Sequence, residues 1–148
     1  IPVSVLFALV REESYFDPSA VSHAGAVGLA QIMPETGADL AARMRMTEEP
    51  DLTDATMSIQ MGAYYLGNLS ERFKPISRAL AAYNGGQGRV RRWQAQRNDL
   101  DSLVFFETIP YAETRGYVRK VLVSAVFYGY LYEQISSETT VRGFFPDL

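Results

Sequence analysis

Apolar residues recur along this chain at the spacing of α-helices. Near its start, the positions i, i+3, i+4 and i+7 of one series are filled by Val3, Leu6, Phe7 and Val10. This spacing predicts a helix with one buried face. We expect the helix to end at about Ser14, because the Asp-Pro pair at 17–18 disfavours its continuation.

Further helices are predicted by the same spacing and by the turn residues between them. The first covers about 34–46, the second begins with a cap at Thr53 or Asp54 and reaches residue 73, and the third covers 76–83. A short helix at 90–93, a helix or turn within 98–107, and a long C-terminal helix through 118–132 follow. The second of these segments carries the apolar series Ile59, Gly62, Leu66, Leu69 and Phe73. The tail after Ser136 is expected to be a loop. No segment of useful length alternates with the period of a strand, so the predicted fold class is mainly α.

Two adjacent acids lie near the end of the first helix. At about 100° per residue, Glu13 falls roughly 70° from the centre of the apolar series, whereas Glu12 falls about 170° away. We therefore expect Glu12 to point to water and Glu13 to lie at the edge of the core. Lost hydration there raises the pKa of a carboxyl group towards the range useful for a general acid. The alternative is that Glu13 is capped by local backbone or paired with Arg11.

A loop of small residues follows at 19–28. Gly25 and Gly28 let its backbone approach a ligand closely, although glycines also serve plain turns. The apolar turn after the loop carries Gln31 and Met33 as candidates for contact with a ligand. The alternative is a turn that only packs the loop.

Two further pairs of residues are candidates for binding. Tyr83 and Asn84 stand before a Gly-Gly stop, and an aromatic face beside an amide suits a sugar ring with its apolar faces and hydroxyls. They could equally be a core aromatic and part of a C-cap. Glu113 and Tyr117 are four positions apart, so they share one helix face and can bind a common partner. The alternative for this pair is a solvated helix start.

Composition narrows the class of protein. The 148 residues are enough for one domain with a single core, and we expect residues 1–148 to form one domain. Hydrophobic residues make up 47% and charged residues 21%, ordinary values for a globular protein. The net charge of -3 argues against nucleic acid as a partner, which would need a clustered basic excess. The cations Arg89, Arg91 and Arg92 are better explained as a solvated helix face.

Several kinds of site are disfavoured by residue type. The chain has no cysteine, which excludes disulfides and thiolate metal ligands, and its single histidine, His23, makes a histidine-rich metal cluster impossible. No apolar run reaches the roughly 18 residues of a membrane-spanning helix. The chain begins at Ile1 without a Met or a charged leader, so we expect that it was excised from a longer secreted protein.

Taken together, the motifs resemble the catalytic domain of the soluble lytic transglycosylases, relatives of goose-type lysozyme. The resemblance covers nearly all of residues 2–131. It is carried by ES at 13–14, GLAQIMP at 28–34, AYNGG at 82–86, and IPYAET with YV at 109–118. Ala30 departs from the family, which commonly has Met or another large apolar residue there. We expect this change to widen the local packing without touching the chemistry.

The resemblance implies a lysozyme-like fold with a cleft for peptidoglycan glycan strands, in the periplasm or bacterial cell envelope. It implies non-hydrolytic cleavage of the β-1,4 bond between N-acetylmuramic acid and N-acetylglucosamine, leaving a 1,6-anhydro ring, with no metal or organic cofactor. Glu13 would be the catalytic acid and then the base. The residues expected to bind substrate or hold Glu13 are Ser22, Gln31, Met33, Tyr83, Asn84, Glu113 and Tyr117.

Two other functions remain open at this point. One is a hydrolytic muramidase that uses Glu113 or Asp17 as a second carboxylate. The other is a non-catalytic peptidoglycan-binding or envelope-assembly module. If the helix phase is right, Glu13→Gln abolishes lysis and leaves glycan binding largely intact, whereas Glu12→Gln has little effect.

Overall fold

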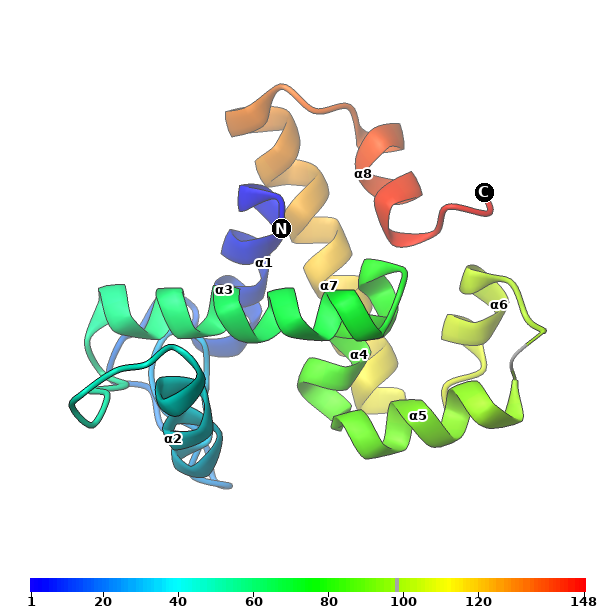
Figure 1. Ribbon diagram of the computed structural model, residues 1–148. Helices are drawn as coiled ribbons and strands as arrows, with labels where there is room; N and C mark the ends of the chain where they lie inside the picture. The colour runs from blue at the N-terminus through cyan, green and yellow to red at the C-terminus, as the bar shows by residue number, and fades with distance from the viewer. Residues whose placement is uncertain (98) are drawn as a thin grey trace.

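The computed structural model describes residues 1–97 and 99–148, and its described part is almost entirely helical (Figure 1). The elements are α1 (Val3–Ser14), α2 (Pro34–Arg43), α3 (Ala55–Arg72), α4 (Ile76–Gly85), α5 (Gln87–Gln96), α6 (Ser102–Glu107), α7 (Ala112–Tyr128), the π-helical turn η1 (Gly129–Glu133) and α8 (Ser137–Phe144). The predicted mainly helical class is confirmed. Residue 98, within the predicted helix or turn at 98–107, lies outside the described residues.

Helices α1 and α7 pair along their whole length in antiparallel directions. At the start of α1, the Ser4 amide donates to the carboxylate of Glu133, just beyond α7. Near the end of α1, Arg11 and Glu12 both bond to Ser124 in the second half of α7. The last turn of α1 is therefore fixed against α7.

The buried face of α1 differs from the predicted one. Val3 and Phe7 are 52% and 42% exposed, and only Val10 of the predicted series is fully buried. The core instead takes Val5, Ala8 and Leu9. The small Ala8 side chain favours close packing of α1 on α7. This contact joins segments far apart in sequence, so the apolar spacing within α1 does not reveal it. Helix α1 nevertheless ends at Ser14 as predicted.

The loop between α1 and α2 folds back on itself. Val27 forms isolated antiparallel bridges with Val21 and with Ile32. Gly28 has φ +80°, and a Cβ atom there would lie 1.9 Å from the Leu52 carbonyl oxygen. Glycine is thus required at 28 both by backbone conformation and by close approach.

Helix α3 and helix α4 build the centre of the core. In α3, the Asp54 carboxylate caps the helix by accepting from the Met57 amide at 2.7 Å, as one of the two predicted caps. The predicted apolar series holds in Gly62, Leu66, Leu69 and Phe73, which are buried, while Ile59 is partly buried. Helix α4 stops at Gly85, also as predicted. Figure 1 shows α3 crossing in front of α1 and α7.

Two parts of the predicted helix pattern need correction: the end of α2 and the C-terminal tail. Helix α2 ends at Arg43 rather than near 46, because Arg45 takes a left-handed conformation with φ +56°. The tail after Ser136 is a helix, α8, and not a loop. Ser136 caps it by accepting from the Thr139 amide, and Phe144 inserts into the core. The sequence did contain this cap, but the helix is too short to show a full apolar series.

Candidate active site

Glu13 lies in the last turn of α1, largely buried, as predicted. Burial raises the pKa of Glu13 to about 7, hydrogen bonding by Tyr117 opposes the rise, and the negative charge of Glu12 adds to it. The predicted alternative of a pair with Arg11 is wrong, because Arg11 bonds to Glu12. A carboxyl group with a pKa near 7 is protonated in a large fraction of molecules at neutral pH and can give up its proton.

Two tyrosines from other helices surround this carboxyl group. Tyr117 of α7 and Tyr83 of α4 are both raised in pKa, first by their burial and next by the charge of Glu13. The Tyr117 hydroxyl approaches Glu13 but, among the described residues, has no partner of standard hydrogen-bond geometry. The structure therefore brings together three of the predicted site residues, Glu13, Tyr83 and Tyr117, from segments far apart in the chain.

The Tyr83 hydroxyl also fixes the loop. It donates to the Ala30 carbonyl oxygen at 2.7 Å, and its ring packs on Tyr65 with centroids 5.0 Å apart. Ala30 is fully buried against Gly62, where a Cβ on the glycine would lie 2.6 Å from the Ala30 Cβ. The expected widening at Ala30 is wrong, because α3 and the loop approach closely enough to fill the space. Tyr83 thus joins the core and faces the candidate site.

Gln31 acts on the same loop. It adopts φ +48°, and its side-chain amide donates to the carbonyl oxygens of Ala20 and Gly28, each at 3.0 Å. Met33 is 40% exposed and immediately precedes α2. Ser22 is exposed, and its hydroxyl accepts from the Ala26 amide within the loop. Gln31 is therefore a structural residue of the loop whatever else it binds, while Ser22 and Met33 are open to solvent.

The remaining predicted residues lie where α4 and α7 meet. Asn84 accepts at Oδ1 from the Thr114 hydroxyl at 3.0 Å, which ties the end of α4 to the first turn of α7. Glu113 is exposed in that same turn and forms no hydrogen bond or ion pair with any described residue. Tyr117, one helical turn further on, is buried, so the two side chains differ in exposure.

Glu12 does not point to water, contrary to the prediction. Its side chain is 5% exposed, and its Oε1 accepts from Arg11 at 2.6 Å and from Ser124 at 3.1 Å. The reason is that the face of α1 opposite the exposed Val3 and Phe7, which carries Ala8 and, one helical turn later, Glu12, is the face that packs against α7.

Two residues that support the site were missed. Ser14 is buried, and its hydroxyl lies 3.0 Å from the Leu29 carbonyl oxygen and 3.1 Å from that of Val10, which ties the end of α1 to the loop. Ser58 of α3 accepts from the Ala30 amide. Ser14 is part of the ES motif and could have been found there. Ser58 lies within α3, and a serine in the middle of a helix gives no sequence signal for such a contact.

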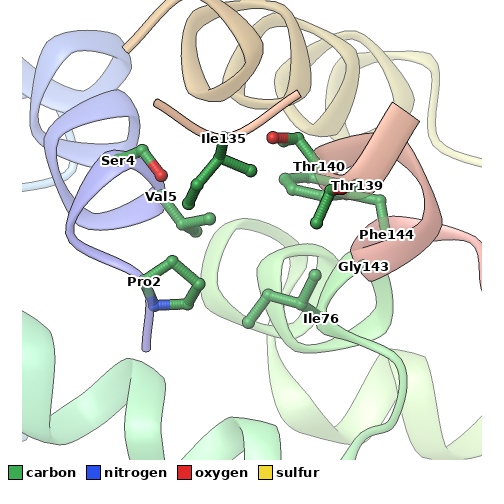
Figure 2. A pocket seen from close by; sticks show the side chains of 9 residues that line it. All are labelled: Pro2, Ser4, Val5, Ile76, Ile135, Thr139, Thr140, Gly143 and Phe144. Carbon is green, nitrogen blue, oxygen red and sulfur yellow. The ribbon is translucent and has the colours of Figure 1, made fainter. Parts of the chain in front are cut away.

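Two cavities in the described part of the chain lie away from Glu13. An apolar cavity of about 190 Å³ is enclosed by α1, α4 and α8, with Val5, Ile76 and Phe144 among its lining (Figure 2). Its lining includes none of the predicted site residues. A polar hollow of about 120 Å³ runs between α2, α3 and the start of α5, and is lined by Asn68 and by Tyr65, the ring that packs on Tyr83.

Neither a metal cluster nor a membrane-spanning helix is found among the described residues. No three His, Asp or Glu side chains among them lie together in a way that could hold a metal ion. No helix in the same residues has the length and apolar character required to cross a bilayer.

Fold and site define a class: a helical, lysozyme-like domain in which a single buried carboxyl group lies against two tyrosines. The transglycosylase SLT domain family matches residues 1–106, and the soluble lytic transglycosylase helical domain matches residues 108–137. The chain therefore belongs to the transglycosylase SLT domain family, and the predicted resemblance is confirmed.

Individual relatives agree with this family. The soluble lytic murein transglycosylase of Escherichia coli is 37% identical over 135 residues, covering 88% of this chain and 21% of the relative. The crystal structure of the 70 kDa soluble lytic transglycosylase from Escherichia coli superposes with a TM-score of 0.84 at 36% identity, over 95% of this chain and 23% of that one. A lytic transglycosylase from Pseudomonas aeruginosa, solved as an inactive Glu-to-Gln variant, gives 0.82 at 38% identity, over 88% and 22%. The chain thus spans about a fifth of these relatives.

Proposed function

We propose that this chain is a peptidoglycan lytic transglycosylase that cleaves the β-1,4 bond between N-acetylmuramic acid and N-acetylglucosamine without water. One observation carries the proposal: burial raises the pKa of Glu13 to about 7 beside Tyr83 and Tyr117. The family and its murein-cleaving relatives supply the substrate class. The site of action follows from that substrate, in the periplasm or elsewhere in the bacterial cell envelope.

In the first step, protonated Glu13 gives its proton to the glycosidic oxygen. The bond from that oxygen to C1 of the muramic sugar breaks, and positive charge develops at C1. The substrate's own N-acetyl group stabilises this charge, as in substrate-assisted glycosidases. The buried surroundings keep Glu13 in its neutral, protonated form until the proton is transferred.

In the second step, the ionised Glu13 takes the proton of the C6 hydroxyl. The C6 oxygen attacks C1 in the same ring, and a 1,6-anhydro sugar forms while Glu13 regains its proton. An internal nucleophile has an effective molarity of about 10⁵ M or more in well-oriented cases, so cyclisation outruns attack by water. One carboxyl group therefore serves both steps.

The substrate-binding residues keep their predicted places in this proposal. Tyr117 and Glu113 hold the substrate or Glu13 from α7, and Tyr83 and Asn84 border the site from the end of α4. Gln31 contributes its side-chain carbonyl oxygen, since its amide hydrogens are taken by the loop. The exposed side chains of Ser22 and Met33 line the cleft near the reacting sugar.

A lysis assay on purified cell walls tests the proposal. We expect Glu13→Gln to abolish loss of turbidity while glycan binding in a pull-down with insoluble walls is retained. Glu48→Gln is the matched control, because Glu48 is an exposed acid in the connection between α2 and α3. Lysis by Glu13→Gln at the rate of the parent chain would refute the proposal. Binding without lysis by the parent chain would favour the non-catalytic module instead.

A further inference from the structure

Glu12 is a buried acid that the proposed reaction does not use. Its carboxylate lies between α1 and α7, 2.6 Å from Arg11 Nη1 and 3.1 Å from Ser124 Oγ. Arg11 also donates to Ser124, at 3.1 Å, so the three side chains close a ring of contacts. An unpaired carboxylate is costly to bury, and here it has two partners, one of them a cation.

The ring of contacts is placed so that it controls where Glu13 lies. On α7, Ser124 follows Tyr117 by seven residues, which is two helical turns and the same face. On α1, Glu12 immediately precedes Glu13. A shift of α1 along α7 that separates Glu12 from Ser124 therefore also moves Glu13 relative to Tyr117.

We propose that Glu12 is a positioning residue: held by Arg11 and Ser124, it fixes the last turn of α1 against α7 and keeps Glu13 facing Tyr117. The inference rests on the proposed function, because it assigns Glu12 a part in that reaction. Glu12 touches no substrate in this account and acts only through Glu13.

The charge of Glu12 has a second effect on Glu13. From α1 it adds to the rise in the pKa of Glu13 that burial causes. The groups that face Glu13 from the other helices are Tyr117 of α7 and Tyr83 of α4, both neutral at physiological pH because their own pKa values are raised.

Glu12 also has cations beyond Arg11 near it. A groove of about 330 Å³ on the outer side of the helix pair is lined by Glu12, Arg11 and Ser124 together with Arg119 and Lys120. The charged end of Arg119 is itself paired with Glu107, so Arg11 is the cation that bonds directly to Glu12.

Two variants separate the contact from the charge. Glu12→Gln keeps an oxygen that can accept from Ser124 and Arg11 but removes the charge. We expect the pKa of Glu13 to fall by about half a unit, since a like charge no longer disfavours ionisation. The alkaline limb of the pH–rate profile moves to lower pH by the same amount. Ser124→Ala leaves the charge and removes the anchor on α7, and we expect kcat to fall about tenfold with KM little changed.

The control is Glu138→Gln on α8. It also removes a carboxylate that is paired with an arginine, but the Arg142–Glu138 pair is exposed and lies on another helix. It should leave both the pH profile and kcat unchanged. Ser124→Thr restores the hydroxyl and should recover most of kcat, which a purely structural loss of stability would not predict.

The pKa of Glu13 is measured by ¹³C NMR titration of its labelled carboxyl group in the parent chain and in the variants. This readout does not require turnover, so failure of the proposed function (no lysis by the parent chain) is distinguishable from failure of the inference about Glu12. An unchanged Glu13 titration and parent kcat in Ser124→Ala would overturn the inference, because Glu13 would then keep its place without the anchor on α7. A changed Glu13 titration in Ser124→Ala, or a loss of kcat that Ser124→Thr restores, would support it.

Discussion

At the scale of single residues, burial decides what Glu13 can do. The folded chain holds the pKa of Glu13 at about 7 against 4.5 for an ordinary glutamate, so the folded state binds the proton more tightly than the unfolded state. By linkage, the stabilisation from this group is complete below about pH 4.5 and is lost as pH rises through 7. The loss amounts to about 3 kcal/mol at most, at 1.36 kcal/mol per pKa unit.

We predict from this that Glu13→Gln flattens the dependence of stability on pH. Urea denaturation at pH 5 and pH 8 should show the parent chain losing more stability between the two values than the variant, because the variant has no buried group to ionise. Glu48→Gln, in an exposed connection, should behave like the parent chain. Parallel pH dependences for the parent chain and Glu13→Gln would show that Glu13 does not titrate in a buried place.

Loss of the hydroxyl group should affect the stability of the chain differently at the two tyrosines beside Glu13. Tyr83→Phe removes the donor to the buried Ala30 carbonyl oxygen and should cost about 1–3 kcal/mol of stability. Tyr117→Phe removes a buried hydroxyl without a partner of good geometry among the described residues, so stability should change little.

The same two tyrosine variants should also differ in the pH dependence of lysis. The Tyr117 hydroxyl lowers the pKa of Glu13, so Tyr117→Phe should move the alkaline limb of lysis to higher pH. Tyr83→Phe should leave the limb in place. If Tyr117→Phe moved the limb to lower pH, the described contact between Tyr117 and Glu13 would be wrong.

At the scale of elements, the loop between α1 and α2 depends on one glycine. Gly28→Ala places a Cβ atom 1.9 Å from the Leu52 carbonyl oxygen at a left-handed backbone, and we expect a loss of about 3 kcal/mol or more. Gly25 has a similar φ of +93° but open space around it, so Gly25→Ala should cost only about 1–2 kcal/mol of backbone strain. Chemical denaturation of the two variants measures the difference. Equal losses would mean that the close approach to Leu52 is absent.

Local patterns were enough to predict most elements. The apolar series of α3, its cap at Asp54 and the glycine stop of α4 are each encoded within a few neighbouring residues. The helical tail α8 was missed because its buried contacts, such as Ser77 Oγ donating to the Phe144 carbonyl oxygen, join positions 67 residues apart. The short helix is stabilised mainly by this packing rather than by its own sequence.

The same limit explains the errors in α1. Val3 and Phe7 look like core residues by spacing, yet the face that packs on α7 carries the smaller Ala8 and the charged Glu12. Which face is covered depends on the partner helix, and spacing within one helix does not contain that information. Glu13 still lies at the edge of the core as the phase predicted, because it is close to the boundary between the predicted and the observed buried faces.

At the scale of the whole molecule, three segments far apart in sequence meet at one carboxyl group. Helix α1 supplies Glu13, α4 supplies Tyr83 and α7 supplies Tyr117. The loop is joined to this arrangement through the Tyr83–Ala30 and Ser14–Leu29 contacts. A site fixed from three sides in this way holds one carboxyl group in place, and one acid is sufficient for the proposed chemistry.

The products of cleavage test that central claim most directly. Purified wall glycan is digested with the parent chain, and the released fragments are weighed by mass spectrometry. The account predicts muramic ends that are lighter by one water than hydrolytic ends, and none of these products with Glu13→Gln. Fragments carrying the added water would contradict it and would make the chain a muramidase with a second carboxylate.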